Sequence, residues 1–362
     1  MLRVLVFTVV FFLAFLINLG VTPLLIRISH KFKWYDAIDE RKIHPDKMPR
    51  IGGVGIFVGF AVAAFVYVVG CHILDIKELN NLSKYSHLLL VTGFFIITAM
   101  GLMDDFLNLR ARLKFVIQII AALCISLGGF HFHIFHIPGT EIGFTLNPLV
   151  SHALTVLWII SFCNAINLMD GMDGLAGGIS FIGAIFYIVI FGLSSNFTAM
   201  AVSACILGAL LSFLIFNFPP AKIYMGDSGS LLLGFSMAVI PLINNQPPVS
   251  SNVLLPAFLI FIIPVMDMIA AILRRYRRKL SIFSPDREHL HHKLQDFGFS
   301  VKQVLALIYS FSVLAGICAL VFTAIDNGAF AMLFFFLVWF FYVGMFAMVH
   351  FLNRARKKQR YN

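Results

Sequence analysis

The chain has 362 residues, of which 60% are hydrophobic and 12% charged, and its mean hydropathy is +0.92. Soluble domains carry about a quarter charged residues, so this composition excludes an ordinary water-soluble protein and indicates one that the bilayer solvates. The net charge of +10 does not indicate a nucleic-acid partner, because in a membrane protein a basic excess marks the cytoplasmic loops.

Eleven apolar segments are candidates for membrane spans, which take about 20 residues each. In chain order they are Leu2–Ile28, Gly53–Cys71, His87–Met103, Leu113–Phe130, Val150–Leu168, Gly174–Leu193, Phe197–Phe218, Gly229–Ile243, Val253–Leu273, Val301–Phe322 and Phe330–Phe351. The eighth is short and has Pro241 near its end, so ten spans is the alternative. We predict an all-α, polytopic integral membrane protein in which residues 1–362 form a single domain.

Neither a cleaved leader nor disulfides are expected. The first segment is too long for the apolar region of a signal peptide and lacks a small-residue cleavage site, so we predict a helix. The five cysteines include no CxxC pair and lie in or beside apolar stretches. We interpret them as small buried hydrophobic residues rather than as disulfides or metal ligands.

The positions of Lys and Arg predict the orientation in the membrane. If the N-terminus lies outside, then of the 27 Lys and Arg residues only Arg3, Lys77 and Lys84 lie on the outer side. All the others follow odd-numbered segments or lie in the C-terminal tail, which the positive-inside rule assigns to the cytoplasm. We expect a multi-pass protein of a bacterial inner membrane, with its C-terminus inside and its N-terminus outside.

Carboxylates are rare in this chain, so their positions are informative. At a helix–bilayer boundary a carboxylate is costly unless it is paired, solvated or bound to a cation, which makes it a candidate for function. Six of them follow or lie within odd-numbered segments, on the predicted cytoplasmic side: Asp104, Asp105, Asp170, Asp173, Asp227 and Asp267. Their gathering at one face indicates a shared polar site.

Polar residues recur every third position where the fifth segment ends, at Asn164, Asn167, Asp170 and Asp173. Successive positions on such a helix drift by about 60° and stay on one side, so the pattern predicts a surface that lines a cavity. The adjacent Asp104 and Asp105 would point about 100° apart on a helix. That separation suits two separate roles better than joint coordination of one ion.

A glycine- and serine-rich stretch, Gly226-Asp227-Ser-Gly-Ser230, opens the eighth segment. A helix N-terminus presents free N–H groups and partial positive charge, so we expect it to bind a phosphate. The Asp227 carboxylate would suit Mg²⁺, which prefers oxygen ligands and shares them with substrate phosphates. The alternative is that Asp227 only caps the helix.

Histidines occur in two groups. The stretch 284–293 offers Arg287, His289, His291 and His292 for phosphate oxygens; the spacing of His289 and His292 also resembles a zinc site, but no cysteine supports one. The second group is predicted to lie on the outer side and is interpreted as an interfacial loop rather than a metal site. Its members are His131, His133 and His136.

Asp267 lies inside the ninth segment and has two interpretations. It either faces the cavity or pairs with Arg274 or Arg275 one to two turns later; we favour a supporting role behind the residues that contact substrate. The basic run Arg274–Lys279 is interpreted as a topology anchor, and attraction to anionic lipid is consistent with it.

Taken together, these motifs resemble the polyprenyl-phosphate N-acetylhexosamine-1-phosphate transferases, and among them the undecaprenyl-phosphate N-acetylglucosamine-1-phosphate transferases. The resemblance covers nearly the whole chain. It rests on five motifs in order, Lys42-Ile-His44 to Gly53, Asp104-Asp105, Asn164 to Leu175, Asn217 to Ser230, and Phe283 to His292. One position departs from the pattern, because some members carry a third aspartate where this chain has Asn108.

The resemblance implies transfer of a sugar 1-phosphate from a UDP-N-acetylhexosamine to undecaprenyl phosphate, with release of UMP, dependence on Mg²⁺ (Mn²⁺ can substitute) and a homodimer by analogy. It implies that Asp227 and Asp173 are metal ligands and that Asp104 and Asp105 are catalytic. The residues that it places at the substrates are Lys42, His44, Arg50, Asn164, Asn167, Asp170, Asn217, Arg287, His289, His291 and His292.

Three questions stay open at this stage. The His-Leu-His-His stretch favours an N-acetylhexosamine donor, with phospho-MurNAc-pentapeptide transfer as the alternative. Direct attack by the lipid phosphate is favoured over a covalent intermediate, because a metal and positioning suffice for phosphoryl transfer. A proton-coupled transporter is the rival class, although carboxylates near one surface and glycine-rich loops favour an enzyme.

Overall fold

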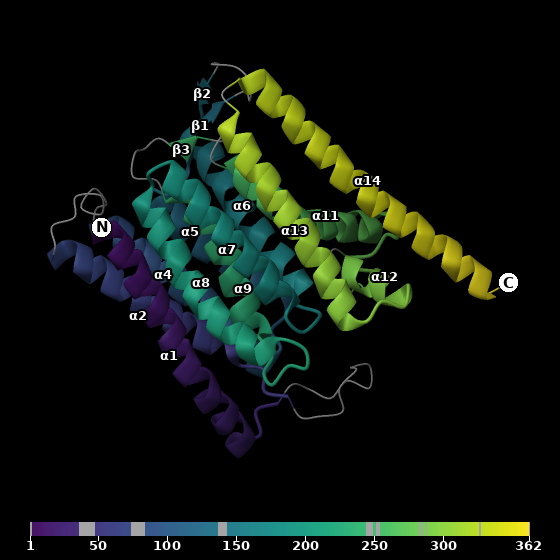
Figure 1. Cartoon of the computed structure of the whole chain (residues 1–362), viewed down its shortest axis with the longest axis horizontal. Helices are drawn as coiled ribbons and strands as arrows, with labels where there is room; N and C mark the ends of the chain where they lie inside the picture. The colour runs from purple at the N-terminus through teal and green to yellow at the C-terminus, as the bar shows by residue number, and fades with distance from the viewer. Residues whose placement is uncertain are drawn as a thin grey trace.

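The computed structural model describes residues 2–35, 48–73, 84–136, 143–243, 249–250, 254–281, 284, 286, 288–325 and 327–361. The prediction of an all-α, multi-pass protein is confirmed. Eight helices of the described chain are long and apolar enough to cross a membrane. They are α1 (Leu2–Phe32), α2 (Gly52–Ile73), α4 (Lys84–Leu107), α6 (Pro148–Met169), α7 (Leu175–Leu193), α8 (Phe197–Asn217), α13 (Val301–Ala324) and α14 (Gly328–Tyr361) (Figure 1).

The other predicted segments are helical but shorter or bent. The fourth is α5 (Ala111–Leu127), and the eighth is α9 (Gly226–Val239) followed by the 3₁₀ turn η1 (Ile240–Leu242). The ninth is divided into α10 (Leu254–Ile260) and α11 (Ile262–Arg277), which meet at 77°.

Proline chemistry explains the division of the ninth segment. Pro264 has no N–H to donate to the carbonyl of Ile260, and its ring would clash with that carbonyl in a continuous helix. The helix therefore ends at Ile260 and restarts after Phe261, whose backbone lies outside the helical region at φ −101° and ψ 24°. If the pair counts as one span, the described chain has up to nine long spans.

The remaining elements lie at the two ends of the bundle. Helix α12 (Leu290–Asp296) follows α11 at one end. At the other end β1 (Phe132–His136) pairs antiparallel with β2 (Gly143–Thr145) and parallel with β3 (Val249–Ser250), in the order β2-β1-β3 (Figure 1).

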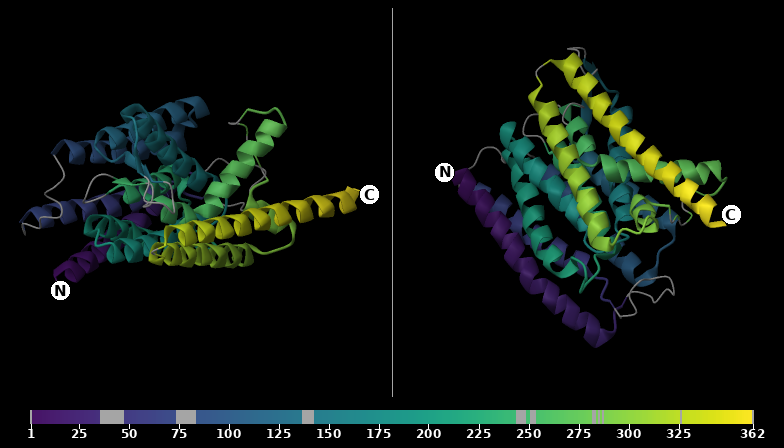
Figure 2. Two further views of the ribbon diagram at one scale, coloured as in Figure 1. Left: turned by 90° about the horizontal axis from the view of Figure 1, so that it is seen from above. Right: turned by 45° about the vertical axis from the view of Figure 1, so that its right-hand side comes forward.

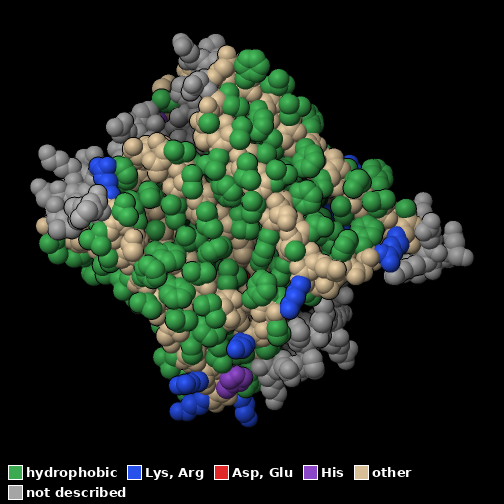
Figure 3. All heavy atoms as spheres, in the orientation of Figure 1, with side chains coloured by type: hydrophobic (Ala, Val, Ile, Leu, Met, Phe, Trp, Pro, Cys, Tyr) green, Lys and Arg blue, Asp and Glu red, His purple; other side chains and the backbone are tan. Residues whose placement is uncertain are grey.

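Helix α9 forms the centre of the bundle. Every residue of α9 except Asp227 is buried, and α2, α4, α6 and α7 pack around it. A helix that is apolar on all sides is stable only when other helices enclose it. The outer helices instead expose large apolar side chains, and Figure 3 shows hydrophobic side chains over most of one face with Lys and Arg at its margins. This surface fits a protein embedded in lipid.

Small residues allow the backbones of neighbouring helices to approach closely. The contact of Gly208 in α8 with α1 is one place where this packing can be tested. A Cβ atom there would lie 2.2 Å from the carbonyl oxygen of Phe11 in α1, whereas one at Gly70 in α2 would meet nothing within 4 Å. We expect Gly208→Ala to destabilise the protein by about 1–3 kcal/mol through overpacking. Gly70→Ala should be neutral or slightly stabilising. Thermal unfolding in detergent would measure both, and equal midpoints would contradict this packing.

Candidate functional site

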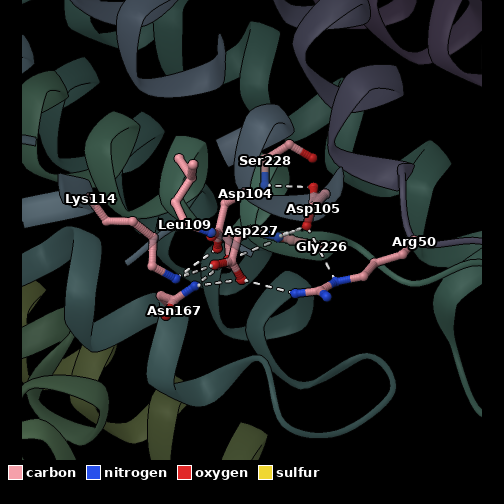
Figure 4. Close-up of polar contacts among 10 residues, drawn as sticks. Arg50, Asp104, Asp105, Leu109, Lys114, Asn167, Gly226, Asp227 and Ser228 are labelled. Carbon is pink, nitrogen blue, oxygen red and sulfur yellow. Dashed lines mark hydrogen bonds and ion pairs between the residues drawn. The ribbon is translucent and has the colours of Figure 1, made fainter. Parts of the chain in front are cut away.

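The site forms where the end of α4 meets the beginning of α9. Asp104 and Asp105 close α4, Asp227 opens α9, and Arg50 comes from the segment before α2 (Figure 4). Lys114 from the first turn of α5 and Asn167 from the last turn of α6 complete the group. Five elements therefore bring charged and polar side chains to one place.

Asp105 holds the N-terminus of α9. Its side chain is 1% exposed, and its two oxygens accept the backbone N–H groups of Asp227 (2.7 Å) and Ser228 (3.0 Å). Arg50 Nε lies 3.3 Å from the same carboxylate. A carboxylate stabilises a helix N-terminus because it satisfies free N–H groups and faces the positive end of the helix dipole.

This contact corrects the prediction that the start of α9 offers its free N–H groups to a phosphate. Two of those groups donate to Asp105, and Gly226 makes the approach feasible. Gly226 has φ +74°, and a Cβ there would lie 2.6 Å from a carboxylate oxygen of Asp105 and 2.3 Å from the carbonyl oxygen of Arg50. Only glycine fits this backbone at this distance.

The carboxylate of Asp227 faces two cations. Its side chain is 18% exposed, and Lys114 Nζ lies 3.1 Å and Arg50 Nη2 3.5 Å from its oxygens. Asn167 donates from Nδ2 to Asp227 at 3.3 Å and to Ser230 Oγ at 2.9 Å. Asp227 is thus the most open carboxylate of the three around α9's first turn, and cations already surround it.

Lys114 joins Asp227 to Asp104. Lys114 Nζ lies 2.7 Å from Asp104 Oδ2, while Asp104 Oδ1 accepts the backbone N–H of Leu109 at 2.7 Å. The two adjacent aspartates therefore have different partners, as their 100° separation on a helix requires. Lys114 was not among the predicted site residues. Its position as the second residue of the predicted apolar span Leu113–Phe130 was a signal, because an ammonium group at a helix–bilayer boundary needs an anionic partner.

The loop after α6 brings two further carboxylates. Asp173 accepts the backbone N–H of Ala221 at 3.1 Å. Burial, and then the negative charges of Asp227 and Asp105, raise the pKa of Asp170 well above its usual range, and Arg50 opposes this shift. Asn167, which donates to Asp227, lies at the end of α6 just before this loop, so the loop begins beside the site.

Two predicted substrate residues are engaged with the protein itself. Asn217 accepts the N–H of Gly174 (2.9 Å) and donates to the carbonyl of Ile223 (2.8 Å), which ties the loop after α6 to the loop before α9. Asn164 donates from Nδ2 to Gln118 Oε1 and to the carbonyl of Ile160, both at 2.8 Å. The role of Asn217 visible here is to hold two site loops in register.

The histidine segment reaches the site from α11 and α12. Asp267, buried in α11, accepts Nδ1 of His289 (2.8 Å) and the N–H of Leu290 (3.1 Å). Of the two interpretations of Asp267, pairing with Arg274 or Arg275 is therefore not the one observed. A carboxylate that fixes one ring nitrogen leaves the other, Nε2, oriented for a ligand.

His291 carries this segment to the loop after α6. Its side chain is 1% exposed, and a Cβ on Gly171 would lie 2.6 Å from His291 Nε2. Neither ring nitrogen has a hydrogen-bond partner among the described residues. Burial, and then repulsion from His292, whose ring centroid is 4.2 Å away, lower the pKa of His291 to about 3. The ring is therefore neutral across the physiological range.

Ion pairs fasten the start of the segment to α11. Arg274 donates from Nε (3.0 Å) and Nη2 (2.6 Å) to Asp286, and Arg278 Nη2 lies 2.5 Å from Glu288. Burial raises both pKa values, but the backbone N–H of Glu288 and then Arg274 hold the pKa of Asp286 below its usual range, and Arg278 does the same for Glu288.

Other predicted residues lie elsewhere. Lys42, His44 and Arg287 fall outside the described residues. His131 and His133, which were predicted to lie on the outer side, stack with ring centroids 4.0 Å apart near β1, and the ring centroid of His131 also lies 4.6 Å from that of His152. The side chain of His136 is not described.

The donor set at α9 fits a hard divalent cation. Within the described ranges no three His, Cys, Asp or Glu side chains are arranged to hold a metal. Mg²⁺ does not need such a cage, because it binds through one or two carboxylates and completes its shell with water and substrate phosphates. Asp227 presents a partly open carboxylate beside two cations that neutralise its charge, so the side chains present suit a site that a substrate completes.

Comparisons with known proteins identify relatives of the chain. Residues 87–245 match the family model described as glycosyl transferase family 4. The chain is 35% identical to a probable undecaprenyl-phosphate N-acetylglucosaminyl 1-phosphate transferase of Bacillus subtilis, over 88% of this chain and 86% of that protein. It is 36% identical to a decaprenyl-phosphate N-acetylglucosaminephosphotransferase of Mycobacterium leprae, over 75% and 72%.

A relative of different named activity is also similar. The phospho-N-acetylmuramoyl-pentapeptide-transferase of Bacillus mycoides is 30% identical over 84% of this chain and 94% of its own length.

The cap on α9 predicts a stability defect. Asp105→Asn keeps the shape, but its amide offers one acceptor oxygen and turns an NH₂ toward the second N–H. We expect a loss of about 1–3 kcal/mol, the cost of one unsatisfied buried donor, measured as the unfolding midpoint in detergent. A midpoint equal to that of the unchanged protein would mean that Asp105 does not cap α9.

The buried His291 predicts a pH dependence of stability. The unfolded chain takes up a proton on this ring near pH 6.5, whereas the folded protein does so only near pH 3. Stability should therefore fall as pH drops below 6.5, by at most about 1.4 kcal/mol per pH unit from this group. His291→Gln should flatten the fall between pH 7 and pH 5 in thermal unfolding. The exposed His72→Gln serves as control and should leave the slope unchanged.

Proposed function

The chain belongs to the family of undecaprenyl- and decaprenyl-phosphate N-acetylglucosamine-1-phosphate transferases, and from this we propose that it transfers N-acetylglucosamine 1-phosphate from a UDP-sugar to undecaprenyl phosphate. The observation that supports this function is the group of carboxylates and cations at the first turn of α9 (Figure 4). Anionic substrates and a divalent cation need such a mixed site.

The transfer is a displacement at phosphorus. An oxygen of the lipid phosphate bonds to the phosphorus that carries the sugar, and the bond from that phosphorus to the bridging oxygen breaks. UMP leaves with the electron pair, and the product is a lipid-linked sugar pyrophosphate. Because both reactants are anionic, positioning and charge neutralisation are the main demands on the protein.

Two carboxylates would hold the metal. Asp227 and Asp173 would ligate Mg²⁺, or Mn²⁺ in its place, and the bound ion supplies neutralisation of the donor pyrophosphate. The remaining charged groups then have separate tasks. Lys114 and Arg50 attract phosphate oxygens, and Asp104 orients Lys114 through their 2.7 Å contact.

The histidine segment would contact the donor. Asp267 fixes Nδ1 of His289, so that Nε2 is the nitrogen available to a phosphate or sugar oxygen. The buried ring nitrogens of His291 have no hydrogen-bond partner in the part of the chain that the structure describes, and a ligand atom beside Gly171 would satisfy them.

The site would face the cytoplasm of a bacterial inner membrane. Arg50, Lys114 and the basic end of α11 lie on the side that the distribution of Lys and Arg assigns to the cytoplasm. The water-soluble UDP-sugar would enter from that side, while the lipid phosphate would arrive within the bilayer.

Turnover with a panel of donors tests this proposal. Purified protein with undecaprenyl phosphate, Mg²⁺ and UDP-N-acetylglucosamine should release UMP, and omission of either the lipid or Mg²⁺ should abolish it. Asp227→Asn should lower the rate roughly 100-fold or more, because the site loses a charge that acts on the transferred group. Asp296→Asn is the matched control. It makes the same chemical change at a carboxylate in α12 that accepts a hydrogen bond from Asn353, and this variant should retain activity.

Other outcomes would redirect the assignment. If UDP-MurNAc-pentapeptide were the one donor that supports UMP release, the chain would be a pentapeptide transferase. The similarity to the Bacillus mycoides enzyme is the reason to include this donor in the panel. If folded protein that binds Mg²⁺ released no UMP from any UDP-sugar, the transferase function would be contradicted.

A further inference from the structure

The turn between α6 and α7 is held at Gly174. This residue precedes the first turn of α7 with φ +77°, a backbone conformation that glycine adopts without a steric penalty. Glycine also loses more conformational freedom than any other residue when its backbone is fixed. Asp173, one of the two carboxylates proposed to ligate the metal, comes directly before it in the chain. The placement of this carboxylate therefore depends on what holds Gly174.

Side chains from two other helices hold Gly174 on both sides. Its N–H donates to Asn217 at the end of α8 (2.9 Å), and its carbonyl oxygen accepts the hydroxyl of Tyr309 from α13 (2.6 Å). The same carbonyl accepts the N–H of Gly178 in α7 (2.8 Å), and a carbonyl oxygen has two lone pairs for two such donors. The peptide group that joins Asp173 to Gly174 and the one that follows it are thus both fixed.

Helix α7 has room for the tyrosine at Gly178. Helix α13 lies between α7 and α14 and packs against both (Figure 2). A Cβ on Gly178 would overlap the hydroxyl oxygen and the Cζ atom of Tyr309, so a larger residue there would displace the ring. The absence of a side chain at Gly178 is therefore what lets a residue of α13 reach the turn before α7.

Apolar packing does not require the hydroxyl of Tyr309. A phenylalanine ring would fill the same space, whereas a hydroxyl in a membrane-spanning helix has to find an acceptor. The acceptor here is the carbonyl of the residue that follows Asp173. The side chain of Asp173 is also held, because its Oδ2 accepts the N–H of Ala221 (3.1 Å). Backbone and carboxylate are therefore fixed from different elements.

We propose that Tyr309 is a positioning residue for Asp173. Its hydroxyl holds the turn so that the carboxylate is in place for the divalent cation before the cation binds, which reduces the ordering that binding has to impose. Tyr309 contacts neither the cation nor the substrates and acts through the backbone of Gly174. This inference rests on the proposed function, because that function assigns Asp173 to the metal.

Metal binding without turnover tests the inference. Tyr309→Phe keeps the ring and removes the hydroxyl. We expect the dissociation constant for Mn²⁺ to rise roughly three- to tenfold, the effect of one lost hydrogen bond that orders a ligand. The measurement is the electron paramagnetic resonance signal of free Mn²⁺, titrated into purified protein in detergent without donor.

Tyr342→Phe is the matched control. The hydroxyl of Tyr342 in α14 donates to the carbonyl of Phe311 in α13, also at 2.6 Å, so this variant loses the same kind of bond to the helix that carries Tyr309. Both variants should lower the thermal midpoint, but Tyr342→Phe should bind Mn²⁺ like the unchanged protein. If both midpoints fell and neither Mn²⁺ affinity changed, Tyr309 would have only a structural role and the inference would be overturned.

A double-mutant cycle tests whether Tyr309 acts through Asp173. Asp173→Asn should itself weaken Mn²⁺ binding. In the Asp173→Asn protein, Tyr309→Phe should change the remaining affinity by less than about twofold, because the carboxylate that it positions has been removed. An undiminished effect of Tyr309→Phe in that background would overturn the inference, because the hydroxyl would then act on another group.

UMP release separates this inference from the proposed function. With UDP-N-acetylglucosamine and undecaprenyl phosphate, Tyr309→Phe should raise the Mg²⁺ concentration for half-maximal rate, while the rate at saturating Mg²⁺ stays within about twofold of the unchanged protein. If none of the proteins released UMP, the transferase function would be contradicted, and Mn²⁺ binding would still decide the role of Tyr309. Normal UMP release together with unchanged Mn²⁺ and Mg²⁺ dependence in Tyr309→Phe would reject the positioning role and leave the transferase intact.

Discussion

The site depends on the carboxylate of Asp105 at the N-terminus of α9. A fully enclosed helix cannot direct its first N–H groups to water, so a neighbour has to accept them. Asp105 does this from α4 and is itself neutralised by Arg50. The same contacts set the position of Asp227, because its own N–H is one of those that Asp105 accepts. Helix packing and site geometry are thus one constraint, and the close approach at Gly226 makes it feasible.

A second helix begins in the same way. Asp267 of α11 accepts the N–H of Leu290 at the start of α12 and also the ring nitrogen of His289. In both cases a carboxylate from one helix caps another and orients a side chain that faces the site. Such contacts keep polar groups in place before a substrate arrives, which lowers the reorganisation needed during reaction. They also explain why buried aspartates are tolerated at the edge of a membrane, since each has donors.

Much of this arrangement could be predicted from the sequence. The features that could not be predicted depend on contacts between different segments of the chain. Apolar length predicted the helices, and the rarity of Asp predicted that the carboxylates gather, because both depend on the chemistry of single segments. The partners of those carboxylates could not be predicted in this way. The use of Asp105 as a cap, and the bridge that Lys114 makes to Asp104, depend on contacts between segments. The bend before Pro264 is an intermediate case, because the residue is visible but other helices contain proline without such an angle, as α1 does.

The balance of charge gives the strongest argument for a divalent cation under the proposed reaction. Five carboxylates gather around the start of α9 and the loop after α6, and among the described residues Arg50 and Lys114 form ion pairs with three of them, Asp104, Asp105 and Asp227. Burial, and then the negative charges of Asp227 and Asp105, raise the pKa of Asp170, so further negative charge beside this loop is unfavourable. A pyrophosphate and a lipid phosphate would meet repulsion at such a surface. A divalent ion held by Asp227 would reverse the local sign, and the site could then bind the phosphates that the free carboxylates repel.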